Sequence, residues 1–118
     1  MQTKKDLKEA YKQMKFPAGV FQIRNTSNGK IYIDSSVNLN TIWNRHKTQL
    51  KFGSHPNEEL QKDWNLLGED CFVYEIVSET DQKDNEPTDL AKEVKQLEQL
   101  FLEELQPYND KGYNKKKK

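Results

Sequence analysis

Short runs of β-branched and aromatic residues flank the dipeptide Asn28-Gly29 in the first third of the chain. Residues 19–26 and 30–35 have the composition of strands. Asn and Gly both tolerate the positive φ angles of a two-residue turn, so this stretch predicts a β-hairpin. Apolar side chains fall on both faces of the two strands, which indicates a sheet covered by helices.

Four other stretches have apolar residues at the spacing of an α-helix. Residues 3–15 predict a short N-terminal helix, and residues 38–51 and 88–105 predict two longer ones. Ser54-His55-Pro56-Asn57 opens a further helix, with Pro56 expected in its first turn and Gly68 at its end. Asn38 and Thr88 are the predicted N-caps.

A third strand is predicted between the last two helices. Residues 71–78 alternate well enough for a strand, whereas residues 79–89 are acidic, polar and contain Pro87, which predicts a loop. The elements together predict an α/β (α+β) fold, a small three-stranded antiparallel sheet flanked by helices.

Composition limits the possible classes of protein. The chain has 118 residues, 33% hydrophobic and 32% charged, which fits a single domain with a small core. No apolar run approaches the roughly 20 residues that a membrane span needs, and no secretory signal precedes the domain. The lone Cys71 forms no intrachain disulfide, and no Cys/His cluster indicates zinc. We therefore expect a cytoplasmic protein without a membrane partner.

The net charge is zero, but the charge is unevenly distributed. Residues 1–51 carry 10 basic and 3 acidic side chains, and residues 52–104 carry 4 basic and 15 acidic ones. Such polarity is compatible with a basic face for nucleic acid, with an acidic half that docks a basic protein, or simply with solvated surfaces.

Two polar side chains fall on apolar helical stripes. His46 lies among Leu39, Ile42, Trp43 and Leu50, where it is either a satisfied core residue or a catalyst. Glu98 borders the stripe formed by Leu90, Val94, Leu97, Phe101 and Leu105. A carboxylate there needs a cation, a metal or several donors unless it reaches water.

Several short motifs occur together at fitting separations. The hairpin has Gly-Val-Phe at 19–21 and Tyr-Ile-Asp at 32–34, and Trp-Asn-Arg-His at 43–46, Glu98 and Gly-Tyr-Asn at 112–114 follow. This order resembles the GIY-YIG nuclease superfamily and is similar to the catalytic domain of phage intron-homing endonucleases. The resemblance covers residues 18–114. Residues 1–17 would then be a helical extension, and residues 115–118 a disordered lysine tail.

The resemblance implies one-metal hydrolysis of a DNA phosphodiester bond. Residues of the right type stand at five family positions: Tyr32, His46 and His55 as catalytic residues, Glu98 as the metal ligand, and Asn114 as the late asparagine. An active domain would therefore use Mg²⁺ or Mn²⁺ and no small-molecule cofactor. Its chemistry would combine general-base catalysis with electrostatic stabilisation of the transition state.

Three positions depart from the family pattern. Phe21 replaces the first-motif tyrosine and has no hydroxyl, and Ile42 replaces an arginine that would stabilise the phosphate. Asp34 replaces a glycine and adds a carboxyl group, which either repels a phosphate or joins Glu98 in binding a metal. Arg45 is three residues after Ile42, and we expect the helix to place it at a different azimuth from that of the family's arginine.

These departures favour a catalytically impaired domain over an active enzyme. Losing a general base costs ~10²–10⁴ in rate and losing a transition-state donor ~10²–10³, so the domain would be ~10⁴–10⁷ slower than an intact relative. The first hypothesis is a catalytically impaired domain that binds nucleic acid or a protein partner. The alternative is an active endonuclease with a rearranged site, in which His46 is the base.

Overall fold

The computed structural model describes residues 17–80 and 90–115. The predicted N-terminal helix, the N-cap Thr88, most of the loop at 79–89 and the lysine tail beyond residue 115 lie outside the described residues. None of the described helices is long and apolar enough to cross a membrane.

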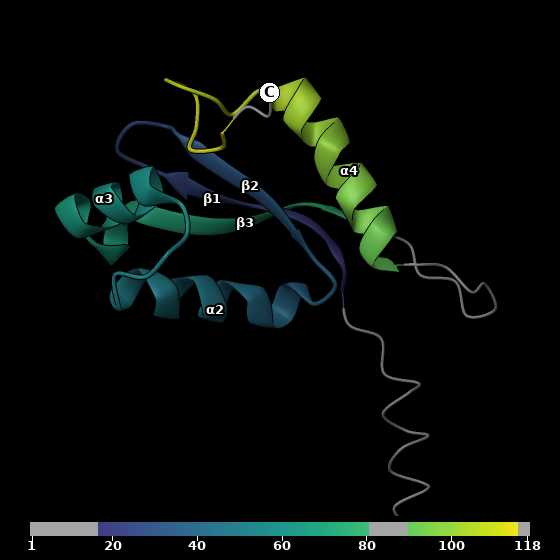
Figure 1. Ribbon diagram of the computed structural model, residues 1–118, viewed down its shortest axis with the longest axis horizontal. Helices are drawn as coiled ribbons and strands as arrows, with labels where there is room; N and C mark the ends of the chain where they lie inside the picture. The colour runs from purple at the N-terminus through teal and green to yellow at the C-terminus, as the bar shows by residue number, and fades with distance from the viewer. Residues whose placement is uncertain (1–16, 81–89, 116–118) are drawn as a thin grey trace, which may run out of the picture.

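A three-stranded antiparallel sheet forms the centre of the fold, as predicted (Figure 1). The strand order is β2-β1-β3, so β1 (Gly19–Asn25) is central and pairs with both β2 (Ile31–Ser36) and β3 (Phe72–Glu79). The hairpin turn between β1 and β2 contains Gly29, whose φ is 78°. The strand β2 is therefore an outer strand, with no neighbouring strand of the sheet along one of its edges.

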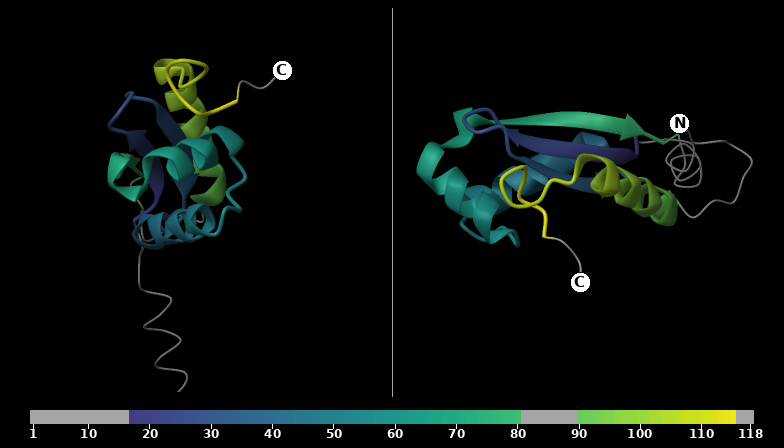
Figure 2. Two further views of the ribbon diagram at one scale, coloured as in Figure 1. Left: turned by 90° about the vertical axis from the view of Figure 1, so that its left-hand side faces the viewer. Right: turned by 90° about the horizontal axis from the view of Figure 1, so that it is seen from above.

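Helices cover both faces of this sheet (Figures 1 and 2). The helices α2 (Leu39–Lys51) and α3 (Glu58–Leu67) lie on one face, and α4 (Leu90–Leu105) lies on the other. The main core lies on the α2–α3 face and consists of eight buried residues: Phe21, Ile23, Leu39, Leu50, Leu60, Trp64, Phe72 and Tyr113.

Most predicted helix ends are confirmed, with a correction for α3. Asn38 caps α2 as predicted, because its side chain accepts a hydrogen bond from the Asn40 amide. The N-cap of α3 is Asn57, whose side chain accepts from Leu60 N. Because the cap fixes the helix start at Glu58, Pro56 precedes the helix and is not in its first turn.

Two further predictions were inexact. Leu105 was placed on the apolar stripe of the last helix, but it is 38% exposed. It is the last residue of α4, where few neighbours remain to cover it. Cys71 lies in the short 3₁₀ turn Glu69–Cys71, so β3 begins at Phe72.

The C-terminal segment is joined to the first half of the β2 edge. Gly112 forms a parallel bridge with Ile31, and Tyr113 N donates to Ile31 O at 2.9 Å. A Cβ on Gly112 would lie 2.4 Å from Ile31 O and 2.5 Å from Pro107 O, so only glycine permits this approach. The buried Tyr113 hydroxyl accepts from Asn25 Nδ2 at 2.9 Å and donates to Asp63 Oδ2 at 2.7 Å. This segment therefore ties β1, β2 and α3 together.

Candidate active site

A cleft of about 250 Å³ opens at the second half of the β2 edge, between α2 and α4. Its walls come from β2, from one face of α2, from the loop before α3 and from α4. Nine residues line it: Tyr32, Asp34, Ser35, Ile42, Arg45, His46, Gln49, Pro56 and Lys95. Tyr32 and Asp34 are two residues apart on β2 and therefore project from the same face of the strand.

Five positions that the sequence singled out meet in this cleft: Tyr32, Asp34, Ile42, Arg45 and His46. Arg45 lines the same cleft as Ile42, since residues three apart on a helix are neighbours on its surface. Sequence reasoning missed Lys95, although its position three residues before Glu98 on an amphipathic helix placed it beside the predicted metal ligand.

The two histidines form a chain of hydrogen bonds whose proton positions can be assigned. The backbone N–H of Asn57 donates to His55 Nδ1 at 3.0 Å, so in the neutral ring the proton of His55 is on Nε2. That Nε2 lies 2.8 Å from His46 Nδ1, which must therefore accept. The remaining proton of His46 is then on Nε2, 3.6 Å from Asp34 Oδ2. His46 thus has no lone pair directed at the cleft.

Burial also fixes the charge of His55. The side chain lies behind His46, outside the cleft, and it is only 6% exposed. Burial first, and the neighbouring His46 second, lower the pKa of His55 to about 4. His55 is therefore neutral at physiological pH, and it orients His46 rather than exchanging protons with a substrate.

Tyr32 lines the cleft with its ring against both histidines, at centroid distances of 6.0 Å from His46 and 5.6 Å from His55. Burial and then the charges of Asp34 and Glu98 raise the pKa of Tyr32 far above its usual value. The phenol consequently keeps its proton at neutral pH, which opposes its use as a general base.

Asp34 and Glu98 form a coupled pair of carboxyl groups beside the cleft. Burial raises the pKa of Glu98, and its contact with Asp34 adds to this effect. Burial also pushes the pKa of Asp34 upward, but hydrogen bonds with His46, Glu98 and Ser35 outweigh it and lower that pKa. Asp34 therefore loses its proton more readily than Glu98.

Glu98 is more deeply placed than its sequence position indicated. It is 9% exposed and, with Val94, forms the buried part of α4 instead of bordering the stripe. The hydroxyl of Ser35 donates to Glu98 Oε1 at 2.9 Å. Lys95 Nζ lies 3.5 Å from the same oxygen and 3.8 Å from Asp34 Oδ1.

The carboxylates have the oxygen chemistry that Mg²⁺ prefers, but their surroundings do not suit a resident metal. Within residues 17–80 and 90–115, no three His, Cys, Asp or Glu side chains are grouped so that they could hold an ion, so a cation here would rely on the two carboxyl groups and water. The ammonium of Lys95 also lies within 4 Å of both carboxyl groups. These residues therefore do not fit the divalent cation that the family resemblance implies.

Two of the departures from the family pattern have different structural roles. Phe21 is 0% exposed, belongs to the core and packs against the His46 ring at 5.4 Å between centroids. Ile42 is half-buried and contributes an apolar surface to the cleft. At the position of Ile42 the cleft therefore lacks the guanidinium that the family pattern predicts.

The side chain of Asn114 forms hydrogen bonds with the backbone of β2. Its side-chain oxygen accepts from Ile33 N at 2.8 Å, and its amide nitrogen donates to Ile33 O at 2.8 Å. The side chain thus pairs with β2 as a neighbouring strand would. It also lines a depression of about 220 Å³ beside Tyr32, Pro56 and Asn57, next to the main cleft.

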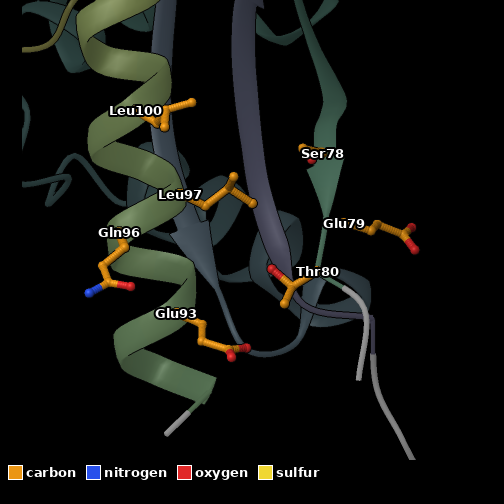
Figure 3. Close-up of a pocket in the computed structure, with 7 residues that line it drawn as sticks. All are labelled: Ser78, Glu79, Thr80, Glu93, Gln96, Leu97 and Leu100. Atoms are coloured by element: carbon orange, nitrogen blue, oxygen red, sulfur yellow. The ribbon is translucent and has the colours of Figure 1, made fainter. Parts of the chain in front are cut away.

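A separate groove of about 450 Å³ lies between β3 and α4, away from these residues (Figure 3). Leu97 points from α4 toward the strands, and Ser78 and Thr80 line the other side of the groove. None of the residues that the sequence analysis assigned to a site lines this groove.

Comparison with known proteins identifies similar intron endonucleases, although no family model matches the chain. The chain is 35% identical over 62 residues to intron-associated endonuclease 1 of Enterobacteria phage T4, which is 51% of this chain but only 25% of that relative. The matched segment therefore spans about a quarter of the relative's length.

Two solved structures extend the similarity to almost the whole domain. The catalytic domain of homing endonuclease I-TevI is 28% identical with a TM-score of 0.69, covering 85% of this chain and 99% of that domain. A point variant of the same domain is 27% identical with a TM-score of 0.69, covering 84% and 93%. The three-stranded sheet and its helices thus have the same fold as the catalytic domain of I-TevI.

Proposed function

Because the chain is a GIY-YIG endonuclease-like domain, we propose that it binds nucleic acid and hydrolyses phosphodiester bonds extremely slowly or not at all. The relatives are named endonucleases, which supports nucleic acid as the ligand of the shared fold. The observation that carries the proposal is the absence of a free proton acceptor among the cleft's phenol and imidazole groups: the Tyr32 phenol keeps its proton, His46 Nδ1 accepts from His55, and His46 Nε2 carries a proton.

Binding still has a physical basis in the cleft. Arg45 is exposed on one wall and Lys95, 64% exposed, is on the other. Two cations across a cleft at an open strand edge can contact successive phosphates of a nucleic-acid backbone. The apolar Ile42 between them lacks the donor that would stabilise a transition state, so binding does not lead to efficient cleavage.

The binding test compares two arginine variants with the same change of charge. Arg45→Ala removes the cation from the cleft, whereas Arg24→Ala removes a guanidinium that is paired with Glu75 at 2.7 Å and does not line the cleft. Fluorescence anisotropy with a short labelled DNA duplex at low salt should show roughly threefold to tenfold weaker binding for Arg45→Ala. Equal losses for both variants would indicate long-range charge alone and would contradict binding in the cleft.

The cleavage test uses supercoiled DNA with Mg²⁺ or Mn²⁺. We expect the wild-type protein to cleave the DNA no faster than buffer alone does, since the missing base and donor together reduce the rate by ~10⁴–10⁷. Cutting that requires the metal and disappears in Glu98→Ala would contradict the proposal.

That outcome would favour a second candidate, an active endonuclease with a rearranged site. One observation supports it: Arg45 lines the same cleft as Tyr32 and His46, so a guanidinium is present near the position that Ile42 leaves apolar. In that case Arg45→Ala should abolish cutting more strongly than it weakens binding, because a transition-state contact contributes more to the rate than to affinity.

A further inference from the structure

The position that a divalent cation would take beside Asp34 and Glu98 lies next to the ammonium of Lys95. Nζ is 3.5 Å from Glu98 Oε1 and 3.8 Å from Asp34 Oδ1. We propose that Lys95 is a built-in cation that replaces the metal and makes the cleft a metal-independent binding site for a nucleic-acid phosphate. The second part of this inference rests on the function proposed above.

Three of the four carboxyl oxygens beside this position already have polar neighbours. Asp34 Oδ1 accepts from the Ser35 backbone N–H at 2.8 Å and also faces Lys95. Asp34 Oδ2 faces His46 Nε2, and Glu98 Oε1 accepts from Ser35 Oγ. A metal bound to any of these three oxygens would therefore compete with a protein partner as well as with the ammonium of Lys95.

The location of Lys95 gives it an advantage over a free ion. It is three residues before Glu98 on α4, so the helix holds it on the same surface as that carboxyl group. A tethered group acts at an effective concentration of the order of millimolar or more. A hydrated Mg²⁺ keeps several waters and binds weakly to one or two carboxylates, so free metal at similar concentration does not displace the lysine.

The same geometry leaves Lys95 available to an anion. The side chain is 64% exposed, whereas those of Asp34 and Glu98 are 26% and 12% exposed. The ammonium therefore neutralises the carboxyl groups on its inner side and faces water on its outer side. A phosphate in the cleft would approach a lysine where an intact relative would offer a metal.

The experiment is a Mn²⁺ titration of isotopically labelled protein, followed by paramagnetic broadening of the amide signals of Asp34, Ser35 and Glu98. The wild-type protein should show little local broadening. Lys95→Ala and Lys95→Met should bind Mn²⁺ there roughly tenfold or more tightly, because the competing charge is gone. Lys95→Arg should exclude the ion as the wild type does.

Lys51→Ala is the matched control. Lys51 is 57% exposed and lies 3.8 Å from Glu69, so it resembles Lys95 in exposure and in pairing but not in position. Its variant should behave as the wild type. Wild-type binding of Mn²⁺ at Asp34 and Glu98 as tight as that of Lys95→Ala would overturn the inference, as would an Ala variant that gains no binding.

A second measurement separates this inference from the proposed function. DNA binding by anisotropy is compared in EDTA and in millimolar Mg²⁺. Equal affinity supports metal-independent binding, whereas affinity that requires Mg²⁺ overturns the role of Lys95 and leaves nucleic-acid binding intact. If the protein binds no DNA in either buffer, the proposed function fails and so does the phosphate site, whatever the Mn²⁺ titration shows.

Discussion

The two halves of the free edge of β2 differ in how their polar groups are satisfied. Along the first half, the backbone of Ile31 and Ile33 pairs with residues 111–114, so the edge is closed by the chain's own C-terminal segment. Along the second half, Asp34 and Ser35 meet side chains from α2 and α4 around a cleft. In the closed half the strand's own backbone groups are paired with the C-terminal segment, which stabilises the fold, whereas in the open half side chains meet around a cleft that a ligand can enter.

The comparison predicts that changes in the closed half reduce stability and changes in the open half alter binding. Gly112→Ala should have the largest effect. The new Cβ would lie 2.4–2.6 Å from backbone and ring atoms of Ile31 and Pro107, which cannot move without breaking the bridge. We expect a loss of about 3 kcal/mol or more in the free energy of unfolding, measured in urea.

Gly53→Ala is its control. Gly53 has a φ of 73°, and nothing lies within 4 Å of a Cβ built there, so that change costs only the backbone strain, about 1 kcal/mol. Similar losses in the two variants would mean that the C-terminal segment does not close the edge as described.

The histidine chain behind the open half should make stability depend on pH. The pKa of His55 is about 4 in the folded protein, against an ordinary value of 6.5. Between these two pH values the unfolded chain therefore binds a proton that the folded chain does not bind. The free energy of unfolding should therefore fall as the pH drops from about 6.5 to about 4, by at most about 3 kcal/mol. It should not fall further from this source at lower pH.

His55→Gln removes that titration while keeping a polar side chain. Urea unfolding at several pH values between 7 and 4.5 should show a lower stability at neutral pH and a flatter dependence for the variant. Parallel curves for the two proteins would show that other groups cause the acid sensitivity.

The sequence predicted the fold well because its signals are local or belong to a motif. The Asn28-Gly29 turn and the helical periodicities specify elements, and the motif order specified how they assemble. The proximity of Tyr32 and His46 followed from the same resemblance, whereas Arg45, expected at a different azimuth of its helix, lines the same cleft as Ile42.

What the sequence did not predict depends on distances between elements. The protonation of His46 follows from the N–H of Asn57, two hydrogen bonds away, and the N-cap geometry of α3 places that group. The i, i+3 spacing places Lys95 beside Glu98, but its contact with Asp34 depends on where α4 crosses the sheet. No local pattern in the sequence encodes that contact or the protonation of His46.

A smaller effect is expected from Asn114→Ala at the end of the closed half. The change removes two hydrogen bonds to the backbone of Ile33, each 2.8 Å long, and should cost about 1–2 kcal/mol. Asn114→Asp keeps an acceptor for Ile33 N but loses the donor to Ile33 O, so its loss should be of similar size or larger. Urea unfolding checks both, and an unchanged stability would show that water replaces this side chain without cost.

The smallest effect on stability is predicted for the open half. Arg45 and Lys95 are both exposed, and solvent screens an exposed ion pair such as that of Lys95, so replacing either by Ala should change the free energy of unfolding by less than about 0.5 kcal/mol. The same two variants should alter DNA or Mn²⁺ binding severalfold, which a purely structural residue would not do. Urea unfolding and the binding titrations on the same samples give this contrast. A stability loss as large as that of Asn114→Ala would mean that the cleft's cations stabilise the fold, and the difference between the two halves of the edge would disappear.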